Sequence, residues 1–203
     1  MKNKNLKIIG YSGHSFVCIE SAQSMGVKTV GYFDIKENLS NPYKLTYFGK
    51  DENISTEDQL FISIGDNSIR EQVFKDTVEK NELDVIIVHE KSIVSNSAAI
   101  GKQTLINAGA IINSNVAVGL GCIVNTGAII DHECRIGNFT HVASGATLAG
   151  NVIVGKNCFI GANSTVIQGV KIGDNVVIGA GTVVIRDVPD AVTIVGNPGR
   201  IIK

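Results

Sequence analysis

A histidine followed directly by a glutamate, His132–Glu133, is the pair of residues in this chain best suited to acid–base chemistry. Imidazole titrates near neutral pH, and a neighbouring carboxylate orients the ring and raises its basicity. Such a pair can take a proton from a nucleophile as it attacks an electrophilic carbon, a reaction that needs no metal. His132 is therefore the candidate general base and Glu133 its partner. The alternative is an ordinary surface histidine.

Composition narrows the classes of protein. Of 203 residues, 44% are hydrophobic and 18% charged, which is typical of a globular chain of one domain plus a small second one. Basic and acidic residues nearly balance, 18 against 19, so no surface for nucleic acid is predicted. We expect no signal peptide and no membrane span, because no apolar stretch approaches the ~18 residues required.

The cysteines predict a cytoplasmic protein with reduced thiols. They show no CxxC pairing and no metal-ligand spacing: Cys18, Cys122, Cys134 and Cys158. We therefore expect no metal site. The last three occupy a small-residue position of the repeat described next, which favours packing over nucleophilic catalysis. This argues against a covalent intermediate on a cysteine.

A repeat of six residues must position the histidine pair. Every sixth residue from Ile100 to Val184 is aliphatic, and the residue two places earlier is small or β-branched. A helix has a period near 3.6 and a strand a period of 2, so neither alone explains six. Short strands alternating with turns do, and three hexads close one triangular coil. The sequence predicts a parallel β-helix over residues 91–203.

Two consequences follow from the repeat. Gly, Asn, Asp or Ala usually follows the inward aliphatic residue, and we expect these residues to serve the turn with positive φ. Residues eighteen apart stack, so Gly150 is expected one coil above His132 and Ser114 one coil below it. A glycine beside the histidine leaves room for a ligand and exposes a backbone N–H.

The first half, residues 1–90, has strands and helices in alternation. We expect strands at 6–10, 27–33, 59–64 and 84–88 and helices at 15–25 and 68–80, with the polar segment 36–57 unassigned. This pattern predicts a small Rossmann-like parallel α/β domain, in which ligands bind at the carboxyl ends of the strands.

Three segments fall at that edge: Gly10–His14, Asp34 and Gly65–Asn67. Glycines before a helix let backbone N–H groups approach a phosphate, and Asp34 is suited to ribose hydroxyls or a uracil edge. Tight strand–helix turns are the alternative reason for the glycines. The complete GxGxxG motif is missing, so no dinucleotide cofactor is expected.

The hexads resemble those of the hexapeptide-repeat acyltransferases, which are left-handed parallel β-helices and usually trimers with active sites between neighbouring helices. With the α/β half included, the whole chain resembles nucleotide-sugar acetyltransferases of the PglD/NeuD type. The matching motifs are G-x-S-G-H at Gly10–His14, I-G-[DN]-N-x-x-R at Ile64–Arg70, N-H-E at 131–133 with Asp131 in place of Asn, and G-N-P-[AG] at Gly196–Gly199.

The resemblance implies a role for each matching residue. The nucleotide is expected on Ser12, Gly13, His14, Asp34, Ile64, Gly65 and Arg70. Asn125 is expected against the sugar and His132 as the general base. His141 is expected against the acetyl donor, with a turn-packing histidine as the alternative. The coenzyme A channel is expected along Gly150, Gly161, Gly179 and Ala180, under a cap at Pro198. Arg200 and Lys203 are expected in a solvated terminus, with contact to the coenzyme phosphates as the alternative.

The resemblance also implies an activity. We expect an acetyl-CoA-dependent N-acetyltransferase acting on a UDP-linked 4-amino-4,6-dideoxy sugar, as in a UDP-N-acetylbacillosamine-type pathway of glycan biosynthesis. We expect a homotrimer with intersubunit active sites. One alternative is O-acetylation of sialic acid or of a polysaccharide hydroxyl. The other is a non-catalytic nucleotide-binding scaffold.

Overall fold

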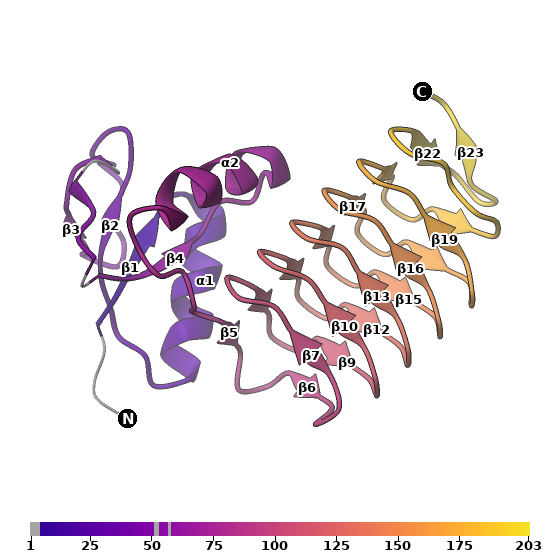
Figure 1. The fold of residues 1–203 in the computed structure, drawn as a ribbon, viewed down its shortest axis with the longest axis horizontal. Helices are drawn as coiled ribbons and strands as arrows, with labels where there is room; N and C mark the ends of the chain where they lie inside the picture. Colours follow the sequence, from indigo (N-terminus) through magenta and orange to yellow (C-terminus); the bar gives the residue numbers. More distant parts are fainter. Residues whose placement is uncertain (1–4, 51–52, 57) are drawn as a thin grey trace.

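The computed structural model describes residues 5–50, 53–56 and 58–203, which form an α/β unit followed by a β-helix (Figure 1). The α/β unit contains β1 (Leu6–Ile9), α1 (Gly13–Ser24), β2 (Thr29–Phe33), β3 (Thr46–Tyr47), β4 (Gln59–Ile62) and α2 (Asn67–Val78). Its strands are parallel, in the order β3-β2-β1-β4. The segments after β1, β2 and β4 therefore meet at one edge of the sheet, as predicted.

The β-helix has three faces built from short strands. The eight-stranded face contains β5 (Ile87–Val88), β8 (Leu105–Ile106), β11 (Ile123–Val124), β14 (His141–Val142), β17 (Phe159–Ile160), β20 (Val177–Ile178), β22 (Thr193–Val195) and β23 (Arg200–Ile201). The six-stranded face contains β6 (Ile93–Val94), β9 (Ile111–Ile112), β12 (Ile129–Ile130), β15 (Thr147–Leu148), β18 (Thr165–Val166) and β21 (Val183–Val184). The five-stranded face contains β7 (Ala99–Ile100), β10 (Ala117–Val118), β13 (Arg135–Ile136), β16 (Ile153–Val154) and β19 (Lys171–Ile172).

The aliphatic residue of each hexad points into the axis, as the repeat predicts. Parallel pairing aligns residues eighteen apart, for example Ala117 with Arg135. The inward residues from Ile106 to Val184 form one buried cluster together with the small residues beside them. Burying each such side chain contributes about 1.5–3 kcal/mol, so the stacked core stabilises the β-helix along its whole length.

The predicted position of positive φ in the turns is wrong. Positive φ occurs three residues after the inward residue, at every sixth position from Gln103 to Gly181, and not directly after it. The glycines directly after the inward residue are small for another reason. A Cβ on Gly101 would lie 2.5 Å from the backbone of Gly119 in the next coil. These glycines therefore allow successive coils to stack closely.

A second correction concerns the predicted strand at 84–88. Ile87–Val88 forms β5, which pairs with β8 and so belongs to the β-helix. The fourth strand of the α/β sheet is instead β3, inside the polar segment left unassigned. Sequence periodicity could not distinguish these cases, because two residues are too short to show an alternation.

The α/β unit covers the first coils of the eight-stranded face. Cys18 and Ile19 of α1 share a buried cluster with Leu105 and Ile123, whose side chains point outward from that face. In the described part of the chain, no helix is both long and apolar enough to span a membrane.

Candidate active site

His132 and Glu133 lie at the corner between the six-stranded and five-stranded faces, directly after β12. His132 Nδ1 lies 3.2 Å from Glu133 Oε2, and the two side chains are 48% and 63% exposed. The backbone of Glu133 has φ +61°, a conformation that residues other than Gly and Asn rarely adopt. With Nδ1 donating to the carboxylate, Nε2 carries the free lone pair of a base.

Gly150 lies one coil above His132, as the repeat predicts, and the imidazole rests against it. A Cβ on Gly150 would lie 2.5 Å from His132 Nε2, so no larger residue fits without moving the ring. Asp131 fixes the backbone of His132. Its Oδ1 accepts from His132 N at 2.8 Å and from Asn113 Nδ2 at 2.8 Å. The Oδ1 acceptor that Asn would supply is thus also present with Asp131.

The carboxyl edge of the α/β sheet forms an open cleft. A cavity of about 420 Å³ is lined by Tyr11 and residues 34–39. Asp34 organises it, because its carboxylate accepts from the backbone N–H of Tyr11 at 2.9 Å and of Ile35 at 2.7 Å. Gly10 has φ +89°, and a Cβ there would lie 2.8 Å from the Ile64 side chain. Ser12 and Gly13 remain exposed at the N-terminus of α1.

The structure brings His14, Gly65, Asn125 and His141 together above the covered part of the eight-stranded face. The rings of His14 and His141 are 6.2 Å apart between centroids. Asn125 Nδ2 lies 3.2 Å from His141 Nε2. The pKa of His14 falls to about 4 and that of His141 to about 3, chiefly through burial and in part through the nearby Arg70 guanidinium. Both rings are therefore neutral at pH 7.

Arg70, which was predicted to contact the nucleotide, is buried between the two units. Its side chain is 2% exposed, and its donors reach Gly121 O, Ile64 O, Gly65 O, Asn67 Oδ1 and Phe139 O at 2.7–3.0 Å. A guanidinium has five N–H donors, so none is left for a nucleotide. Arg70 joins the loop after β4 to the β-helix and thus positions Ile64 and Gly65 without touching a ligand.

The glycines predicted to line the coenzyme channel have packing reasons of their own. A Cβ on Gly161 would lie 2.5 Å from Ile178 O, and one on Gly179 would lie 2.7 Å from Val195 Cγ1. Ala180 stands beside Gly179 in the same turn, and Pro198 lies in the turn at 196–199 between β22 and β23. Arg200 lines a cavity of about 230 Å³ at this end of the β-helix, together with Arg186.

The cysteines pack as predicted. Cys122 and Cys158 are buried, and burial raises the pKa of their thiols to about 12 and about 11. The Sγ atom of Cys134 donates to Ala149 O at 3.1 Å. Thiols held in this way are protonated at neutral pH and are poor nucleophiles.

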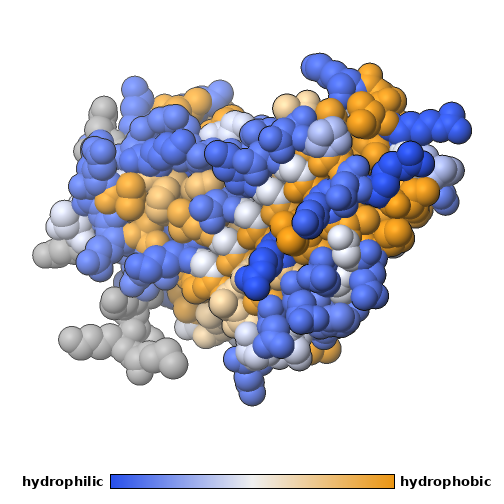
Figure 2. Space-filling view, turned by 45° about the vertical axis from the view of Figure 1, so that its right-hand side comes forward, coloured by the Kyte–Doolittle hydropathy of each residue, from blue (hydrophilic) through white to orange (hydrophobic). Residues whose placement is uncertain are grey.

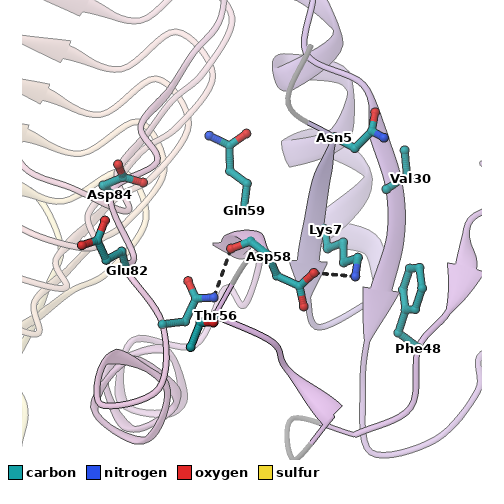
Figure 3. A pocket seen from close by; sticks show the side chains of 10 residues that line it. Asn5, Lys7, Val30, Phe48, Thr56, Asp58, Gln59, Glu82 and Asp84 are labelled. Carbon is teal, nitrogen blue, oxygen red and sulfur yellow. Dashed lines mark hydrogen bonds and ion pairs between the residues drawn. The ribbon is translucent and has the colours of Figure 1, made fainter. Parts of the chain in front are cut away.

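Another cavity lies away from all these residues. It measures about 560 Å³ and opens at the amino ends of the strands, around Lys7, Asp58 and Glu82 (Figure 3). Lys7 Nζ and Asp58 Oδ1 form an ion pair at 2.5 Å, and Lys7 also lies over the Phe48 ring. Lys7 and Asp58 are thus engaged with each other, at the edge of the sheet opposite the predicted site.

Two groups of site residues lie on opposite edges of the six-stranded face. Asn125 follows β11, at the corner with the eight-stranded face, whereas His132 follows β12, at the corner with the five-stranded face. One chain therefore does not bring His132 to the group around His14 and His141.

Sequence reasoning missed residues that join the two units, although the repeat carried a signal for them. Among the positive-φ positions from 103 to 181, only Gln103, Glu133 and Phe139 are neither Gly nor Asn. Gln103 pairs its side-chain amide with Ile62 N and Leu60 O at 2.9 Å, along the edge of β4. Phe139 packs edge-on against Phe74 of α2. A residue other than Gly or Asn at a positive-φ turn position thus indicates that its side chain has a role beyond the turn.

Known proteins agree with this architecture. Residues 5–77 match the PglD N-terminal domain, residues 133–168 the bacterial transferase hexapeptide (six repeats), and residues 151–186 the hexapeptide repeat of succinyl-transferase. The acetyltransferase domain of PglB from Neisseria gonorrhoeae, solved with acetyl coenzyme A, is 30% identical, with 98% of this chain and 100% of that chain covered and a TM-score of 0.93.

PerB from Caulobacter crescentus, solved with CoA and GDP-perosamine, is 34% identical, with 98% of this chain and 97% of that chain covered and a TM-score of 0.91. WeeI from Acinetobacter baumannii shares the fold, with a TM-score of 0.82 at 20% identity. The left-handed β-helix and its repeats define an acyltransferase of the hexapeptide class. Within that class, the chain belongs to the PglD-type sugar acetyltransferases.

Proposed function

We propose that this protein transfers the acetyl group of acetyl-CoA to the 4-amino group of a nucleotide-linked 4-amino-4,6-dideoxy sugar. The observation that carries the proposal is the His132–Glu133 pair resting on Gly150 in a chain similar along its whole length to PglB and PerB. We expect UDP as the carrier, but the motifs do not identify the base, and PerB was solved with a GDP sugar. The carrier is therefore the first variable to test.

His132 acts as the general base in this proposal. Its Nε2 takes a proton as the amine nitrogen attacks the thioester carbonyl, and Glu133 holds Nδ1–H and balances the developing positive charge. A C–N bond forms, the C–S bond then breaks, and the thiolate leaves as CoA. The Gly150 N–H makes no hydrogen bond within the described part of the chain, so it is free to donate to the oxyanion beside His132.

The acceptor's nucleotide binds at the carboxyl edge of the α/β sheet. The exposed N-terminus of α1 at Ser12 and Gly13 suits the diphosphate, because backbone N–H groups and the helix dipole favour anions. Asp34 and the adjoining cavity suit the nucleoside, while His14, Ile64, Gly65 and Asn125 face the sugar.

A homotrimer completes the site, since His132 and the His14 group lie on separate edges of one chain. The outward residues of the six-stranded face between them carry no charge: Ile93, Ile111, Ile129, Thr147, Thr165 and Val183. By contrast, the five-stranded face presents Arg135 and Lys171. Apolar side chains are exposed along the coils, as Figure 2 shows on one flank, and they favour association.

A thiol-release assay with acetyl-CoA tests this function. The acceptors are UDP- and GDP-linked 4-amino-4,6-dideoxy sugars, their 4-hydroxy counterparts and sialic acid. We expect rapid release with an amino sugar and a loss of at least about 100-fold in kcat for His132→Ala. Release with hydroxyl acceptors alone would move the function to O-acetylation, and near-normal turnover of a folded His132→Ala protein would remove His132 from its role.

A further inference from the structure

A buried chain of polar side chains runs from the α/β unit to His141. Ser21 Oγ of α1 donates to Asn107 Oδ1 at 2.8 Å, Asn107 Nδ2 donates to Asn125 Oδ1 at 3.1 Å, and Asn125 Nδ2 lies 3.2 Å from His141 Nε2. Ser21, Asn107 and His141 are 1%, 2% and 8% exposed. We call these four residues the Ser21 relay. The repeat explains part of it, because Asn107 and Asn125 stack in successive coils.

Two backbone N–H groups fix which way each amide points. Ala108 N donates to Asn107 Oδ1 at 3.0 Å, and Thr126 N donates to Asn125 Oδ1 at 2.8 Å. A backbone N–H can only donate, so it settles the oxygen and nitrogen positions that are otherwise inferred from the network. Asn125 Nδ2 must then be the donor to His141, and His141 Nε2 must be the acceptor.

The accepting role of Nε2 decides where His141 carries its hydrogen. A neutral imidazole has one N–H, which must lie on Nδ1 when Nε2 accepts. The pKa of the ring falls to about 3, which keeps the ring neutral; burial is the largest cause, Arg70 and His14 add to it, and the Gly65 carbonyl acts in the opposite direction. Nδ1 is buried, and no acceptor in the described part of the chain meets it at hydrogen-bond distance and angle, although the Gly65 carbonyl lies near the ring. A buried donor without a partner costs about 1–3 kcal/mol.

We propose that the Ser21 relay holds His141 as its Nδ1–H tautomer, so that the ring presents a hydrogen-bond donor to an oxygen of the bound substrates. Ser21 and Asn107 are positioning residues, since they act only through Asn125 and the ring. His141 is a donor and not a second base. The role in acetyl transfer rests on the proposed function, whereas the tautomer does not.

The tautomer can be observed without substrate by ¹⁵N NMR of the ring nitrogens in histidine-labelled protein, with His141→Gln giving the assignment. We expect Nδ1 of the wild-type ring to carry hydrogen and Nε2 to be bare from pH 6 to 8. Asn125→Asp should reverse this, because a carboxylate only accepts. A wild-type ring with hydrogen on Nε2, or one that exchanges between both forms, would overturn the proposal even if acetyl transfer is confirmed.

Kinetics test the relay beyond Asn125. Ser21→Ala should lower kcat about fivefold, the loss expected for one hydrogen bond, with the KM for the nucleotide sugar unchanged. Ser21→Thr should restore it. Ser24→Ala is the matched control, because Ser24 is on the same helix as Ser21 but outside the relay. The Ser24 hydroxyl donates to Ser21 O and accepts from Glu90 N. Equal losses from Ser21→Ala and Ser24→Ala would reduce Ser21 to a general stabilising role.

Discussion

At the scale of single residues, the site depends on which side chains occupy positions that the fold makes costly. Glu133 stands at a turn position with φ +61°, where Gly or Asn is the rule in this β-helix. A residue in such a conformation costs about 1–3 kcal/mol unless its surroundings stabilise it. Glu133 contacts His132, so the proposed catalytic pairing accounts for a residue that is costly at this turn.

Glu133→Asn should therefore raise stability and lower activity. We expect the free energy of unfolding to rise by about 1 kcal/mol, because Asn tolerates positive φ. The loss of the carboxylate should lower kcat at least about tenfold. Urea unfolding and initial rates measure the two effects. In Asn175→Glu, at an exposed turn with φ +56°, stability should fall and kcat should stay the same. Unchanged kcat in Glu133→Asn would argue against the pairing.

The buried histidines predict how stability depends on pH. The pKa values of His14 and His141 fall from 6.5 to about 4 and about 3, chiefly through burial, with Arg70 facing both rings. Above pH 6.5 neither the folded nor the unfolded chain protonates them. Below pH 6.5 only the unfolded chain protonates them. Each histidine should therefore lower the free energy of unfolding by about 1.4 kcal/mol for every pH unit that the pH falls.

Urea unfolding at pH 7.0 and 5.5 measures this slope in wild-type protein and in His141→Gln. The variant should lose less stability over that interval, because it has one fewer group that gains a proton on unfolding. The same slope in both proteins would show that His141 is protonated in the fold.

At the scale of elements, α2 is fastened to three successive coils of the β-helix. Arg70 reaches Gly121 O and Phe139 O, Asn67 Nδ2 reaches Cys158 O at 2.9 Å, and Glu71 accepts from Asn157 Nδ2. The backbone that α2 holds in place includes Ile64 and Gly65, which are predicted to contact the bound nucleotide sugar. The same helix thus joins the two units and positions part of the site.

Arg70→Met should loosen this attachment. It leaves several buried acceptors without a donor, and we expect the free energy of unfolding to fall by at least about 3 kcal/mol. The KM for the nucleotide sugar should rise more than kcat falls, because Arg70 touches no ligand. Lys75→Met, on the exposed side of α2, removes only the ion pair with Glu71 and should cost less than about 1 kcal/mol. Equal effects of the two substitutions would contradict the attachment.

At the scale of the whole molecule, the separation of His132 from the His14 group has a direct consequence. If neighbouring chains share each site, two inactive variants can complement each other. Co-expressed His132→Ala and His14→Ala chains should form trimers in which about a quarter of the sites combine two intact halves. Each variant alone should be nearly inactive.

Activity of the mixed trimers, compared with each variant alone, measures this sharing. Sedimentation provides the control, with an expected mass of three chains of 21.5 kDa each. A trimer without recovered activity would place the whole site in one chain, and a monomer would remove the proposed interface.

The sequence by itself determined the β-helix, because the hexads record which side chain points inward in every coil. It also placed Gly150 against His132, since stacking follows from the eighteen-residue period. Tertiary structure alone decided the role of Arg70, whose motif indicated a ligand contact but whose guanidinium is buried between the two units. It alone joined Ser21 to His141, because hydrogen bonds between residues 86 apart leave no periodic trace in a sequence.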